Sequence, residues 1–149
     1  MISCTEFIPA YSELFCYLEE RGGRDEVLRF WEHLSDHFLD NLRELVTQHG
    51  LRGCWMYWER TLNEEAADFT MELDEAAGEF TIRMRHCPSK GMLLELQQAG
   101  RIEPYHDYCG HCDVLYRRVL EPMGYDFAAD LTECERARCS IVVRDSRER

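Results

Sequence analysis

The spacing of apolar residues changes partway along the chain, and this change constrains the fold more than any other feature. Up to about residue 62, apolar side chains recur every three or four residues, which is typical of helices buried on one side. Between residues 68 and 86 they alternate with polar ones, the period of a half-buried strand. Helices and strands that follow one another in separate groups indicate an α+β fold.

Before the change, the pattern predicts helices over residues 6–20, 26–48 and 51–62. The paired glycines of "RGGR" separate the first helix from the second, and His49-Gly50 ends the second. The second has the clearest apolar stripe, which includes Trp31, Leu34 and Phe38. After the change, "DFTMELD" and "GEFTIRMRH" predict a β-hairpin, and residues 90–99 and 113–120 predict two short helices. A second hairpin is expected after residue 124, with its best β-branched run at residues 141–143.

We therefore expect an α+β fold in which an antiparallel sheet of about four strands, made of two hairpins, packs against helices. Residues 1–149 are expected to form a single domain, mostly helical over 1–62, with a hairpin, two helices and a hairpin over 63–149. A sheet with one uncovered face gains by self-association, which favours a homodimer.

The charge balance excludes two classes of partner. The formal net charge is −12, from 29 acidic and 17 basic residues. Nucleic-acid phosphates and anionic membrane surfaces both attract clustered Lys and Arg, so we expect neither as a partner. The N-terminal stretch lacks a basic region followed by an apolar run, and no apolar run is long enough to span a bilayer.

These observations favour a cytoplasmic location, where most of the 8 cysteines would be reduced. Reduced thiols in such number indicate metal binding, catalysis or simple burial. Cys109-Gly-His-Cys112 is the most informative group, because a helix is expected to start there and the helix end favours the thiolate. The same tetrad serves as the active site of protein disulfide isomerases, but there it follows a buried strand. Here the preceding "AGRIEPYHDY" is polar and contains proline. We therefore rank a thiol oxidoreductase third, after a small-molecule enzyme and after a non-catalytic Cys/His metal- or ligand-binding sensory module.

A metal site would need more ligands than this pair. Cys87, Cys109, Cys112 and His111 could supply them, and such a set suits zinc or an iron–sulfur cluster. Cys134 and Cys139 flank the last hairpin and could also approach, although burial is the default for each. For acid–base chemistry beside a thiolate, or for orienting a histidine, the candidate is Asp113, whereas helix capping is its plainer role.

Three segments, "RHCPSKGML", "YHDYCGHCDVLYRRVLEPMGYDF" and "DLTECERARCSIVV", carry a resemblance to a known family. In that order they resemble the L-2-amino-thiazoline-4-carboxylic acid hydrolase-like proteins. The matching positions are a Cys near a strand end, a Tyr-Cys pair followed by an acidic residue, and a late Cys before apolar residues: Cys87, Tyr108-Cys109, Asp113 and Cys139. The same outline is similar to small-ligand-binding domains of the vinyl-reductase type.

The hydrolase resemblance implies opening of a cyclic C–N bond in a small substrate. Cys109 would be the nucleophile or a ligand, Asp113 with one of His86, His106 and His111 would move protons, and Cys87 and Cys112 would support the site. The vinyl-reductase-type resemblance implies that a small molecule binds without turnover. Both imply a pocket lined by aromatic rings, for which the sequence offers Trp55, Tyr57, Trp58 and Tyr105.

Overall fold

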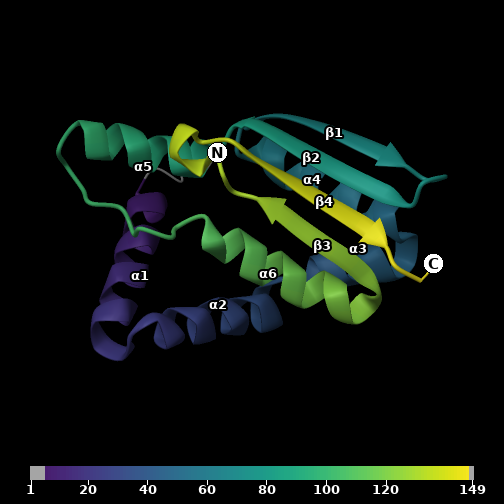
Figure 1. Ribbon diagram of the computed structural model, residues 1–149, viewed down its shortest axis with the longest axis horizontal. Helices are drawn as coiled ribbons and strands as arrows, with labels where there is room; N and C mark the ends of the chain where they lie inside the picture. The colour runs from purple at the N-terminus through teal and green to yellow at the C-terminus, as the bar shows by residue number, and fades with distance from the viewer. Residues whose placement is uncertain (1–5, 148–149) are drawn as a thin grey trace.

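The computed structural model describes residues 6–147 and confirms the α+β fold, with helices packed against a four-stranded antiparallel sheet (Figure 1). Four helices come first: α1 (Phe7–Gly22), α2 (Arg24–Phe38), α3 (Asp40–His49) and α4 (Leu51–Glu64). Within residues 6–147, no helix is both long and apolar enough to cross a membrane.

The strands follow as two hairpins separated by two helices. The first hairpin is β1 (Asp68–Asp74) with β2 (Glu79–His86), and the second is β3 (Tyr125–Asp130) with β4 (Cys139–Asp145). Between them lie α5 (Pro88–Gln98) and α6 (Gly110–Leu120), and two short 3₁₀ turns, η1 (Glu121–Met123) and η2 (Cys134–Arg136), flank β3. The strand order is β1-β2-β4-β3, so the hairpins join through the pairing of β2 with β4.

The two faces of the sheet differ as the alternation predicts. On the helix-covered face, Phe80 pairs with Val143, and Ile82 pairs with Ile141 in the register of β2 and β4. The opposite face carries cross-strand ion pairs, among them Arg83 with Glu72 at 3.3 Å and Arg144 with Glu79 at 2.7 Å. This face is largely polar, and the homodimer stays a prediction.

The long helix expected over residues 26–48 is interrupted, which corrects the sequence-based prediction. Leu39 has φ −110° and ψ 25°, outside helical geometry, and separates α2 from α3. The bend turns Leu39 into the core and leaves Phe38 72% exposed, although the stripe had assigned Phe38 to the buried side. Arg43 donates to the Ser35 carbonyl oxygen at 2.8 Å, which satisfies an acceptor that the broken helix leaves free.

The buried apolar side chains form two groups. The sheet-side core lies between the sheet and α3, α4 and α6, with Trp58, Phe80 and Val143 among its members. The aromatic cluster lies between α1, α2, α5 and the loop before α6 and consists of Phe15, Val27, Trp31, Leu93, Tyr105 and Tyr108. Within the cluster the Phe15 and Trp31 ring centroids are 5.2 Å apart, in an edge-to-face arrangement.

Candidate functional site

A cavity of about 220 Å³ opens at one end of the sheet-side core. Its walls come from α4, the start of α6 and the adjacent ends of the strands, with η2 alongside. Five cysteines from the described part of the chain line it: Cys87, Cys109, Cys112, Cys134 and Cys139. Five aromatic side chains also line it, from Tyr57, Trp58, Tyr108, His111 and Tyr116.

The cysteines meet because each stands where an element begins or ends. Cys87 follows β2 and precedes α5, and its N–H donates to the Ala137 carbonyl oxygen at 2.7 Å, which ties this strand end to the start of β4. Cys109 precedes α6, and Cys112 lies in its first turn. Cys134 opens η2, and Cys139 is the first residue of β4. The topology therefore gathers thiols that are far apart in the sequence.

Burial raises the pKa of four of these thiols, which keeps the four protonated at neutral pH. It raises the pKa of Cys87 to about 11 and the pKa values of Cys112 and Cys139 to about 12. Burial, and then repulsion from a charged Cys112, raise the pKa of Cys109 as well, although the sequence had suggested a thiolate favoured by the helix end. A helix dipole contributes at most about 2 kcal/mol, which the loss of hydration outweighs here. A thiol oxidoreductase needs a low-pKa thiol, and this geometry does not provide one.

His111 makes the closest polar contact with a cavity thiol. Its Nδ1 lies against the Tyr108 carbonyl oxygen, and its Nε2 lies 3.5 Å from the Cys112 Sγ. Burial lowers the pKa of His111, so the imidazole is neutral at pH 7. A carbonyl oxygen can only accept, so Nδ1 carries the proton, and Nε2 presents its lone pair to the Cys112 thiol.

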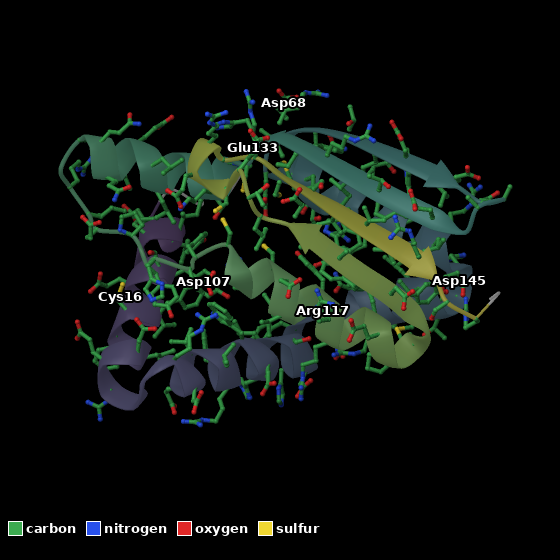
Figure 2. The ribbon with its side chains drawn as sticks, viewed as in Figure 1. Cys16, Asp68, Asp107, Arg117, Glu133 and Asp145 are labelled. Carbon is green, nitrogen blue, oxygen red and sulfur yellow. The ribbon has the colours of Figure 1, made fainter. Side chains whose placement is uncertain are left out.

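Three of the residues predicted for acid–base chemistry lie elsewhere. The Asp113 carboxylate accepts from Arg117 at 2.7 and 3.2 Å and does not line the cavity. Figure 2 shows Arg117 farther along α6 than the sulfur atoms gathered near the start of that helix. His86 is exposed, and its ring lies against Gly91, where a Cβ would come within 2.6 Å of it. His106 is exposed and pairs with Glu19 at 3.0 Å.

The predicted metal ligands border the same hollow, but they do not form a ligand set. Cys87, Cys109, Cys112 and His111 all line the cavity. Within residues 6–147, however, no three or more His, Cys, Asp or Glu side chains are grouped so that one ion could bind them. Zinc and iron–sulfur clusters need such convergence, so the residues present do not fit either group.

Several wall residues were not anticipated from the sequence. Tyr108, in the turn before α6, and Tyr116, on α6, each lie four residues from Cys112, and that spacing was the available signal. Lys90 and Glu65 also line the cavity. Of the predicted rings, Tyr57 and Trp58 belong to the wall, whereas Trp55 and Tyr105 lie outside it.

The chain was compared with protein-family models, with curated proteins and with solved structures, and none of the three comparisons found a match. The family resemblances therefore rest on the quoted segments alone.

Proposed function

We propose that this protein binds one small, largely apolar molecule in the thiol-lined cavity and does not transform it. The cavity itself carries the proposal. Protein interiors are close-packed, and voids larger than a water molecule are few. A hollow of about 220 Å³ bordered by rings is smaller than the sites that hold drug-sized ligands, so it suits a molecule of one or two rings.

The wall is built to keep its shape when it is empty. The Trp58 ring stacks on Phe80 with centroids 5.7 Å apart, and Tyr116 meets Trp58 edge to face at 4.9 Å. Such pairs restrain one another, and a preformed site loses less entropy on binding. The protonated thiols add soft, weakly polar surface, which favours apolar ligands over strongly hydrated ones. The similarity to vinyl-reductase-type ligand-binding domains points the same way.

Two neighbouring alanines on β3 offer a matched test. Ala129 lines the cavity, whereas Ala128 is exposed on the opposite face of the sheet. We expect indole and thiophene to raise the melting temperature of the wild type and of Ala128→Leu, and to leave that of Ala129→Leu unchanged. Isothermal titration would give the affinities. Absence of binding to the wild type, or unchanged binding by Ala129→Leu, would refute the proposal.

A second candidate function is the opening of a cyclic C–N bond, as in the hydrolases that residues 85–143 resemble. One observation favours it: the His111 Nε2 can accept the Cys112 proton across 3.5 Å, which would produce a thiolate inside the cavity. Cys109 would then support the reacting thiol or itself attack. The test is release of ring-opened product from 2-amino-thiazoline-4-carboxylate. Turnover that Cys112→Ser and His111→Gln abolish would favour catalysis, and absence of turnover would leave binding as the function.

A further inference from the structure

We propose that the cavity selects a ligand that carries a negative charge, and that the Lys90 ammonium group binds the anionic part. This inference deepens the proposed function, on which it rests, because it names the charge class of the small molecule. A carboxylate on an aromatic or other apolar body is the simplest chemistry that fits both the charged and the apolar parts of the wall.

Lys90 stands apart from every other basic residue. It is the only lysine in a chain with 17 basic residues, and all the others are arginines. Its side chain is 5% exposed and lines the cavity from the first turn of α5. Lysine is almost never fully buried without a partner, because an ammonium group loses much hydration energy in the interior. A buried lysine at a cavity wall therefore calls for an anion.

The anion that the protein supplies is easily displaced. Lys90 donates to the Glu135 Oε1 at 3.0 Å, and the Glu135 side chain is 70% exposed. Glu135 belongs to η2, a turn of three residues that borders the cavity through Cys134. An exposed carboxylate can return to water at little cost, so a ligand carboxylate arriving from the cavity can take its place. The exchange keeps the ammonium paired throughout.

The other charged groups of the wall also favour an anion. Arg138 lines the cavity, and within residues 6–147 no carboxylate lies within 4 Å of its guanidinium group. The acidic residue of the wall is Glu65, and although it keeps much of its surface in solvent, burial raises the pKa of its carboxyl. The lining side chains thus include two basic groups and one carboxyl group, in a chain of net charge −12. Salt screens charges more than about 8 Å away, so the groups beside the cavity determine the electrostatic potential that a ligand meets there.

Two helix N-termini add to this field. The cavity is bordered by Ser89 and Lys90 at the start of α5 and by His111 and Cys112 at the start of α6. Both helices are 11 residues long, and their first turns lie at the same end of the sheet, beside η2 (Figure 1). The positive end of a helix dipole stabilises a nearby anion. With Lys90 and Arg138, they define the end of the cavity at which the charged group would bind.

The single lysine makes a direct test possible in the full chain. Protein labelled with ¹³C at the lysine Cε gives one side-chain resonance, which reports on Lys90 alone. We would titrate it with benzoate and with benzamide, which share ring and size and differ in charge. We expect both to bind, benzoate roughly tenfold more tightly. Only benzoate should shift the lysine resonance, and the shift should saturate.

Three variants sharpen the test. Lys90→Met should retain benzamide binding and lose the preference for benzoate. Glu135→Gln removes the competing carboxylate without altering a buried group, and it should raise the affinity for benzoate several-fold with no change for benzamide. Glu133→Gln, in the same loop but paired with Arg136, is the matched control and should change neither affinity.

The outcomes separate the two proposals. If indole and benzamide bind, but benzoate binds no better and Glu135→Gln has no effect, ligand binding stands and the role of Lys90 is overturned. The same holds if benzoate binds tightly while the lysine resonance stays in place. If no probe binds the wild type, the proposed function itself fails, and the inference fails with it.

Discussion

The aromatic cluster and the sheet-side core are both buried, but they are packed in opposite ways. In the aromatic cluster large rings meet edge to face, and the Tyr105 hydroxyl at its border donates to Glu19 at 2.7 Å and accepts from Arg24 at 3.0 Å. The sheet-side core has rings of the same size, yet it contains a cavity. The difference lies in the small residues, because cysteines and alanines occupy the end of the core where elements begin and end.

This contrast separates the part of the molecule that holds the fold together from the part that is free to bind. The cluster fixes α1 and α2 against the loop before α6, and thereby positions the first turn of α6, which carries Cys109, His111 and Cys112. The cavity meets the cluster at that turn, where Tyr108 belongs to both. Away from Tyr108, stability and binding should respond to different substitutions.

The largest expected effect is a truncation in the aromatic cluster. Phe15 is fully buried against six rings, so Phe15→Ala should lower the free energy of unfolding by about 3–5 kcal/mol. Cys112→Ala, which removes one sulfur from an existing hollow, should lower it by less than about 1 kcal/mol. Urea denaturation of both variants measures the difference. Equal losses would contradict the contrast between the two regions.

A filling substitution should distinguish the regions by about 1–3 kcal/mol. Ala129→Leu places methyl groups in the cavity and should leave the unfolding free energy unchanged or raise it. Ser12→Leu inserts the same groups beside the aromatic cluster, where packing is complete, and it removes the acceptor of the Tyr105 N–H at 2.8 Å. Overpacking and the lost hydrogen bond should both destabilise the protein. Thermal unfolding without ligand provides the comparison, and a destabilised Ala129→Leu would show that the hollow has no spare volume.

Much of the fold could be predicted from the sequence because periodicity depends on local chemistry. The alternation in "DFTMELD" and "GEFTIRMRH" located β1 and β2 to within a residue, and the glycines marked the ends of α1 and α3. The break at Leu39 was missed, since no proline or glycine marks it. It arises from tertiary packing, which draws Leu39 rather than Phe38 into the core.

The site was less predictable, because its members come together only through the topology of the sheet. The CGHC motif identified Cys109, His111 and Cys112, but its local chemistry suggested a thiolate, and the pKa values depend on burial that a sequence does not reveal. Asp113 was chosen for its place in the motif, whereas Arg117 one turn later engages it. The solitary Lys90 was a signal that composition alone could have given.

The next prediction concerns the effect of low pH on stability, through protonation of His111 in the cavity wall. Burial lowers the pKa of His111 below the unfolded value of about 6.5, so the unfolded chain binds the proton first. The stability that comes from a neutral His111 is therefore fully present above pH 6.5 and is lost as the pH falls. The protein should therefore be less stable at pH 5 than at pH 7.

Two substitutions isolate this contribution from the titration of surface carboxylates. His111→Gln should remove that part of the pH dependence, whereas His33→Gln, at an exposed position on α2, should retain it. Chemical denaturation between pH 7 and pH 5 gives the curves. Parallel curves for the wild type and His111→Gln would mean that the imidazole is solvated and that the His111 side of the cavity is open to water.

The smallest expected effect leaves the fold intact and compares a thiol in each packing environment. Cys87 borders the cavity with a pKa raised to about 11, and Cys54 is fully buried in the close-packed part of the sheet-side core with a pKa raised to about 12. Alkylation requires the thiolate, so at pH 8 Cys87 should react with iodoacetamide roughly tenfold faster than Cys54 and far more slowly than an unfolded cysteine. Both rates should rise about tenfold per pH unit at pH values below these pKa values.

Peptide mass spectrometry resolves the two sites. Indole should slow the alkylation of Cys87 but not that of Cys54, because only the cavity thiol shares its access path with a ligand. Protection of both would mean that indole acts by stabilising the whole fold rather than by filling the hollow.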